Sequence, residues 1–102
     1  MSIVAPMNRD DVIRSLHKLM PEIRNRFKVR GLSLFGSVVR DEARAESDID
    51  VLVDFDDQAS FFDLVRLGIY LEEKLQRKVD VVPRRAVRAE LREPIFHEAV
   101  TV

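Results

Sequence analysis

The chain contains no cysteine, no excess charge of either sign and no long apolar run. Without thiols, disulfides, thiolate metal sites and cysteine nucleophiles are excluded. The 17 basic and 18 acidic side chains nearly cancel, to a formal net charge of -1, so no direct nucleic-acid binding is expected. No stretch approaches the roughly 20 apolar residues of a membrane span, and no signal-peptide pattern opens the chain. We therefore expect a soluble, cytoplasmic protein without membrane contact.

The length favours one domain. At 102 residues and 46% hydrophobic composition, the chain can bury one core but not two. We therefore expect a single domain over residues 1–102.

Apolar periodicity predicts the helices. Steps of three and four predict a helix from Asp10 to Phe27, broken at Pro21 because proline cannot donate to the preceding turn. A capping box begun by Ser60 predicts a helix over about 61–77, with a main apolar stripe that starts at Phe61. The C-terminal remainder is predicted to be helical, with Pro94 as a helix start.

Three segments have the pattern of strands. Residues 32–35 form a short apolar run, residues 48–55 alternate, and residues 79–82 form a run that ends at Pro83. Together with the helices they predict an α/β (α+β) fold, in which helices flank a small mixed sheet of three to four strands.

Two acidic side chains on the alternating strand are suited to chemistry. Asp48 and Asp50 are two residues apart, so both leave one face of the strand, about 6.6 Å apart at the backbone. Hard divalent cations prefer such carboxylate ligands. An isolated Asp-x-Asp is more often part of a solvated strand edge than of a metal site, so the pair needs a second signal.

That signal is Gly36 and Ser37, which follow one predicted strand and precede the acidic strand by a ten-residue spacer. Glycine lets the backbone approach a ligand, and the amides and hydroxyl that follow can donate to phosphate oxygens. Four such fixed positions match by chance on the order of once in 10^5 windows.

The segment GSVVRDEARAESDIDVLVDF resembles the signature of the polymerase-beta-type nucleotidyltransferase superfamily, and the short length resembles its minimal nucleotidyltransferases. The resemblance implies the nucleotidyltransferase fold and two magnesium ions as cofactors, with ATP as the substrate. The site residues that it implies are Asp48, Asp50 and Asp80 for catalysis and metal binding, and Gly36, Ser37 and Arg40 for the nucleotide. For Arg40, a solvated surface arginine is the alternative.

The chain departs from the usual family pattern at two positions. Val38 stands where relatives often have a basic residue, and Asp41 stands where they often have glycine. Val38 removes one possible phosphate contact. Asp41 is expected to need a more ordinary backbone conformation than glycine and to add negative charge near the loop, which would lower nucleotide affinity.

The minimal family is commonly the antitoxin of a toxin-antitoxin pair whose toxin is a HEPN ribonuclease. The resemblance thus implies transfer of AMP to a tyrosine of that toxin; the alternatives are masking by stoichiometric binding and, less in keeping with the small size, transfer to a small molecule. A second apolar stripe, formed by Phe62, Val65 and Ile69, predicts a protein interface. Tyr70 is expected at the helix surface or in an interface.

Overall fold

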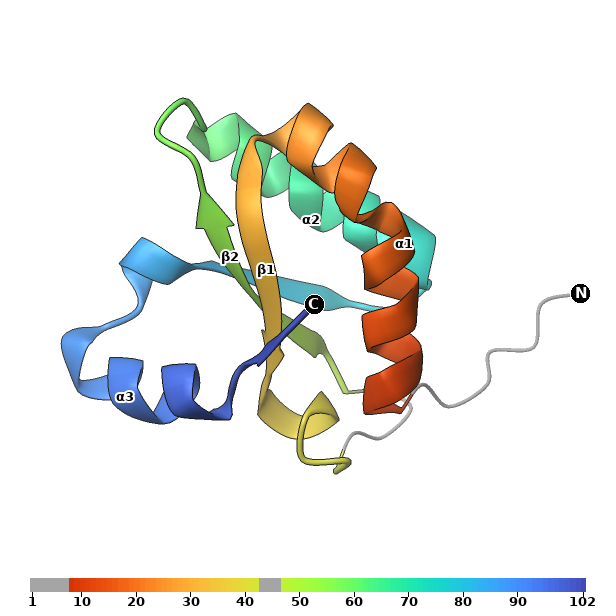
Figure 1. The fold of residues 1–102 in the computed structure, drawn as a ribbon, viewed down its shortest axis with the longest axis vertical. Helices are drawn as coiled ribbons and strands as arrows, with labels where there is room; N and C mark the ends of the chain where they lie inside the picture. Colours follow the sequence, from red (N-terminus) through yellow and green to blue (C-terminus); the bar gives the residue numbers. More distant parts are fainter. Residues whose placement is uncertain (1–7, 43–46) are drawn as a thin grey trace, which may run out of the picture.

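The computed structural model describes residues 8–42 and 47–102 and has a mixed four-stranded sheet in that part of the chain (Figure 1). Residues 1–7, and residues 43–46 in the middle of the ten-residue spacer, lie outside the described part of the chain. The helices are α1 (Arg9–Phe27), α2 (Phe61–Leu75) and α3 (Ala89–Glu98), and two short 3-10 turns are η1 (Gly36–Val38) and η2 (Arg84–Ala86). The strands are β1 (Val29–Phe35), β2 (Ile49–Phe55), β3 (Val79–Pro83) and β4 (Val100–Thr101).

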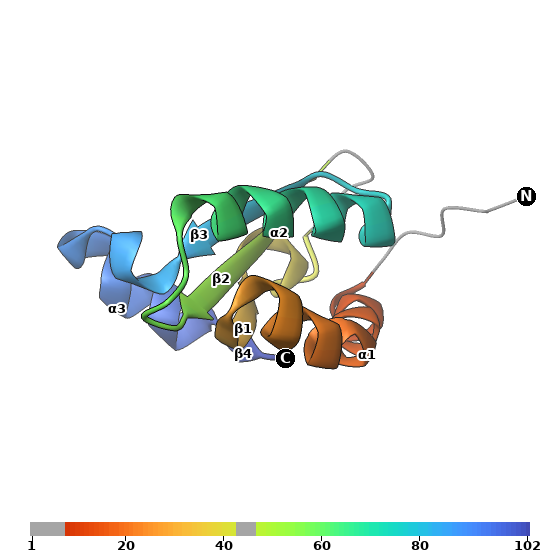
Figure 2. The ribbon, with the colours of Figure 1, turned by 90° about the horizontal axis from the view of Figure 1, so that it is seen from above.

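The sheet has the order β3-β2-β1-β4. β1 pairs antiparallel with both β2 and β4, whereas β2 and β3 are parallel. Since α2 forms the crossover between β2 and β3, it lies over the sheet beside α1, while α3 stands apart from both (Figures 1 and 2). The predicted fold class is confirmed.

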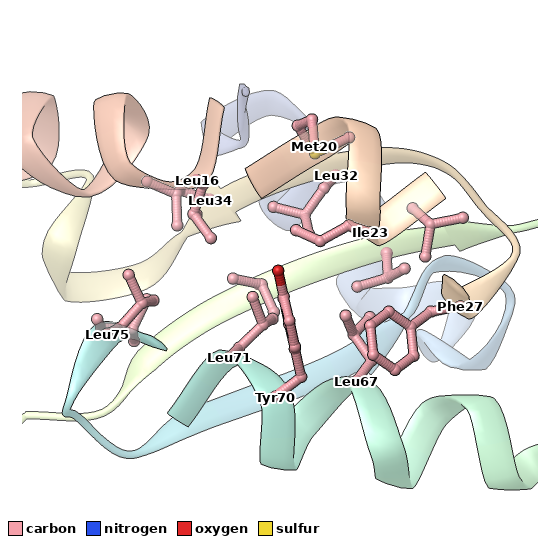
Figure 3. Packing of buried hydrophobic residues seen from close by; sticks show 14 of the residues in the cluster. Leu16, Met20, Ile23, Phe27, Leu32, Leu34, Leu67, Tyr70, Leu71 and Leu75 are labelled. Atoms are coloured by element: carbon pink, nitrogen blue, oxygen red, sulfur yellow. The ribbon is translucent and has the colours of Figure 1, made fainter. Parts of the chain in front are cut away.

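The core lies between this pair of helices and one face of the sheet. Figure 3 shows side chains of α1, such as Leu16 and Ile23, and of α2, such as Leu67 and Leu71, pointing into the same interior. From β2, the fully buried Ile49, Val51 and Val53 join this cluster. Because strand side chains alternate, residues 50, 52 and 54 must leave the opposite face.

Helix α1 continues through Pro21, so the predicted break there is wrong. The helix begins behind Asn8, whose side chain accepts the Asp11 N–H at 2.9 Å. Proline removes one hydrogen bond from the helix, but Met20 and Ile23 on either side of it are buried in the core. The continuous apolar face therefore outweighs the lost backbone bond.

Helix α2 has the predicted capping box, in which the Ser60 N–H donates to Asp63 Oδ2 at 2.8 Å. Two details of the prediction are wrong. Phe61 is 73% exposed rather than part of the buried stripe, and Tyr70 is buried, at 7% exposure, rather than at the surface. The Tyr70 ring packs on Phe27, with centroids 5.1 Å apart, because it faces α1 across the core.

Three other boundaries differ from the predictions. β1 begins at Val29, with a register shift between Val29 and Gly31 that the sequence pattern did not show. Helix α3 begins at Ala89 and contains Pro94 in its interior. The chain then ends in the unpredicted strand β4, whose hydrogen bonds to β1 hold the C-terminus against the sheet. No helix among the described residues combines the length and apolar character needed to cross a membrane.

Candidate active site

The parallel pairing of β2 and β3 brings two predicted site residues together. Asp50 and Asp80 are register partners, so their side chains leave the same face of the sheet, opposite the core helices. Asp48, which is exposed, immediately precedes β2. Sequence separation alone gave no reason for Asp80 to lie beside Asp50; the crossover through α2 provides it.

The electrostatics of Asp50 reflect this grouping. Burial raises the pKa of its carboxyl above the ordinary value, and the negative charges of Asp80 and Asp48 raise that pKa further, while Arg40 opposes them. The three carboxylates therefore interact through space. Such an arrangement is costly without a compensating cation.

Gly36 brings the backbone of the phosphate loop against the acidic strand. It follows β1 directly, and its φ of 80° lies in the left-handed region that favours glycine. A Cβ atom on Gly36 would overlap the carboxylate of Asp50 and would lie 3.1 Å from its Cγ. The predicted close approach of backbone to the site thus requires glycine here for two independent reasons.

The turn η1 determines the backbone conformation of the rest of the loop. The amides of Val39 and Arg40 both donate to the Gly36 carbonyl, at 3.1 and 3.3 Å. Val38 is buried in the core, so its side chain faces away from any ligand. Asp41 has a φ of 55°, so the expectation of a more ordinary backbone at this position is wrong: the tight turn retains the left-handed conformation without glycine.

The side chain of Arg40 is 48% exposed and is paired with two carboxylates. Its Nη1 donates to both carboxylate oxygens of Glu98, at 3.0 and 2.9 Å, and its Nε donates to Glu42 Oε1 at 2.7 Å. These bonds raise the pKa of Arg40, Glu42 contributing most. Arg40 is thus a half-exposed arginine paired with two carboxylates, and its role in nucleotide binding stays a prediction.

Glu98 is a site residue that the sequence analysis missed. It is the last residue of α3, yet its Oε1 accepts the N–H of Gly36 at 2.5 Å. The two residues are 62 positions apart, and only the pairing of β4 with β1 brings them together. No short-range pattern pointed to Glu98, because the two residues of β4 are too few to show the alternation of a strand.

The acidic residues fit magnesium by their chemistry. Within residues 8–42 and 47–102, no three His, Asp or Glu side chains already form a metal-binding group. Asp48, Asp50 and Asp80 nonetheless supply oxygen ligands, and the like charge around Asp50 would be relieved by a divalent cation. These residues could hold the ion, with Ser37 and Gly36 nearby in the loop.

The grouping of Asp48, Asp50 and Asp80 beside the Gly36 loop is suited by its chemistry to a nucleotide with a divalent cation. The chain belongs to the nucleotidyltransferase domain family, which matches residues 16–101. The family resemblance inferred from the motif is thereby confirmed, as is the expectation of an enzyme of this kind.

The chain is similar to several minimal members of the nucleotidyltransferase family. The chain is 39% identical over 90 residues to the protein adenylyltransferase MntA of Thermococcus cleftensis, covering 88% of this chain and 89% of that protein. A solved structure of a candidate minimal nucleotidyltransferase superposes with a TM-score of 0.81, at 33% identity, over 96% of this chain and 99% of that one. The MNT antitoxin chain in complex with a tri-AMPylated Shewanella oneidensis HEPN toxin has the same fold, with a TM-score of 0.66 at 22% identity, over 91% of this chain and 70% of that one.

Proposed function

We propose that the chain is a magnesium-dependent adenylyltransferase antitoxin that transfers AMP from ATP to a tyrosine of a HEPN toxin, and so inactivates the toxin in the cytoplasm. The observation that carries the proposal is the position of Asp50. It is the register partner of Asp80 and also lies against the backbone of Gly36. The carboxylate of Asp50 therefore lies beside Asp80 and also beside the loop that would bind the triphosphate.

In the proposed reaction, the tyrosine hydroxyl oxygen attacks the α-phosphorus of ATP. The bond from that phosphorus to the bridging oxygen breaks, and pyrophosphate leaves. The Gly36 loop, including the Ser37 hydroxyl, donates hydrogen bonds to the phosphates, and Arg40 offsets their charge. Asp80 accepts the proton of the attacking hydroxyl.

Asp48, Asp50 and Asp80 would hold the magnesium ions. Magnesium, when bound, lowers the pKa of the acceptor hydroxyl and offsets the charge that develops on the phosphoryl oxygens. The protein residues supply positioning: β2 and β3 fix the carboxylates, and η1 fixes the loop that faces them.

The acceptor is proposed to be a protein because of what the relatives act on and because of an exposed apolar face on α2. The relative MntA is named as a protein adenylyltransferase, and the related MNT antitoxin is in complex with an AMPylated HEPN toxin. On this chain, α2 presents Phe62, Val65 and Ile69 to solvent, at 76%, 44% and 59% exposure. An apolar helix face of this kind supports binding of a protein partner.

The intact mass of the partner tests the proposal. A HEPN protein encoded in the same genome is incubated with the chain, ATP and magnesium. We expect a mass increase of one or more AMP units on the partner, lost when its acceptor tyrosine is replaced by phenylalanine. If the partner is bound and silenced without a change in mass, the chain acts by stoichiometric masking and the transfer proposal is wrong.

A further inference from the structure

The carboxylate of Glu98 is hydrogen-bonded to Gly36 and Arg40, two residues that are proposed to bind phosphate. Its carboxylate accepts the Gly36 N–H at 2.5 Å, and Arg40 Nη1 donates to both of its oxygens, at 3.0 and 2.9 Å. A backbone amide beside a guanidinium is a typical anion-binding combination. In the free protein, the anion in that position is a side chain of the protein itself.

The contact lies at the end of the β1–β4 ladder, which brings the two segments side by side. Leu34 pairs with Val100 in the antiparallel β1–β4 ladder. Continuing that register two residues forward from Leu34 and two residues back from Val100 reaches Gly36 and Glu98, which lie just beyond the paired residues. The bond from the Val102 N–H to the Leu32 carbonyl, at 2.9 Å, extends the same ladder at its other end.

The Glu98 carboxylate also adds to the negative charge of the site. Its charge is among those that raise the pKa of Asp50. A triphosphate that enters while Glu98 remains in position meets this charge and finds the Gly36 amide and Arg40 already engaged. The side chain of Glu98 is 29% exposed, so it can rotate toward solvent while β4 stays paired with β1.

We propose that Glu98 is an internal competitor of the nucleotide, whose carboxylate must leave Gly36 and Arg40 before the triphosphate can bind there. The inference rests on the proposed function in one respect: it takes Gly36 and Arg40 as phosphate-binding groups. On this inference, Glu98 weakens nucleotide binding. Removing its charge should strengthen binding rather than weaken it.

The test is the affinity of Glu98→Gln for ATP with magnesium, measured by calorimetry. Glutamine keeps the side-chain length and an acceptor for the Gly36 N–H, but loses the charge-assisted bonds to Arg40. Since a hydrogen bond to a charged group is stronger than a neutral one by about 1 kcal/mol, we expect the Kd to fall by about fivefold. Glu93→Gln, which removes one charge from an exposed position of the same helix, should leave the Kd unchanged.

Equal or weaker binding by Glu98→Gln overturns the inference and leaves the proposed function intact. Conversely, a variant that binds ATP more tightly, in a protein that never adenylylates its partner, supports the inference and contradicts the proposed function. If neither protein binds ATP, both are wrong.

A measurement on the unchanged protein covers the event that Glu98→Gln does not fold. The carboxyl carbon of Glu98 and the amide of Gly36 are followed by NMR as magnesium and ATP are added. Both signals should shift together as the nucleotide saturates the protein, because the hydrogen bond between them is replaced. A Glu98 carboxyl signal that stays unchanged at saturation overturns the inference.

Discussion

The backbone of Gly36 lies so close to the side chain of Asp50 that no residue with a side chain fits at position 36: a Cβ atom there would overlap the Asp50 carboxylate. The loop after β1 and the acidic strand β2 are thereby parts of one site, although the residues are 14 positions apart in the sequence. The left-handed φ of Gly36 adds a second requirement for glycine.

Gly36→Ala should therefore reduce both stability and nucleotide binding. A left-handed conformation costs a residue with a Cβ atom about 1–2 kcal/mol, and the overlap with Asp50 adds to that cost. Urea unfolding should show a loss on the order of 2 kcal/mol in the free energy of unfolding. Gly31→Ala is the matched control, because a Cβ atom there meets nothing within 4 Å, and its stability should change little. Equal losses in both variants would contradict this account of the loop.

Tyr70→Phe should change how stability depends on pH in the alkaline range. Burial, followed by the hydrogen bond that Tyr70 donates to Glu22, raises the pKa of the phenol from 10.0 to about 12. Because the folded state favours the neutral phenol, this contribution is fully present below pH 10.0 and is lost as the pH rises toward about 12.

Unfolding measured between pH 9 and about 12 checks this prediction. The wild type should lose more stability than Tyr70→Phe over that interval, since only the wild type has the phenol to ionise. Near neutral pH, the variant should be less stable by about 1–2 kcal/mol, for the lost hydrogen bond to a carboxylate. Parallel curves for the two proteins across the alkaline range would show that Tyr70 does not titrate as described.

ATP binding should require a divalent cation. The charges around Asp50 already raise its pKa, so a triphosphate without a cation meets uncompensated repulsion from the same carboxylates. Calorimetry with magnesium, and again in chelator, measures the difference. We expect binding in the first condition and none in the second; equal affinity in both would be inconsistent with the acidic residues forming part of the nucleotide site.

Phe62→Ser should weaken partner binding and leave the fold intact. Phe62 is 76% exposed on α2, so its removal takes little from the core. A large apolar side chain at the centre of an interface commonly contributes about 2 kcal/mol, which corresponds to a roughly thirtyfold rise in the Kd of the complex with the proposed HEPN partner. Leu91→Ser, at a 47% exposed position on α3, is the control. Similar effects of the two substitutions, or none from Phe62→Ser, would exclude this face of α2 from the interface.

Patterns of neighbouring residues in the sequence were sufficient to predict strand β2, which carries Asp50, and helix α2, which follows it. The alternation of β2 identified the buried face of the strand, and therefore the face from which Asp50 leaves. The capping box at Ser60 located the start of α2. These features could be predicted because each depends on residues close together in the sequence.

The errors arose where distant packing decides the structure. Pro21 remains within α1 because the core on both sides of it holds the helix, and Tyr70 is buried because α1 lies across from it. Strand β4 has only two residues and is stable because β1 offers an edge to pair with. The role of Glu98 depends on that pairing, so no local pattern could reveal it.

Replacement of Asp80 by asparagine tests the central claim most directly, because it changes one carboxylate of the proposed metal site and keeps its volume. The measurement is the intact mass of the proposed HEPN partner after incubation with ATP, magnesium and either variant. Asp54→Asn is the matched control: it removes one exposed carboxylate from the same face of the sheet, four residues along β2 from Asp50. We predict that Asp80→Asn adds no AMP although it folds at least as stably as the wild type, since repulsion near Asp50 is relieved, and that Asp54→Asn transfers AMP normally. Transfer by Asp80→Asn at the wild-type rate would contradict the three-carboxylate site and, with it, the proposed mechanism.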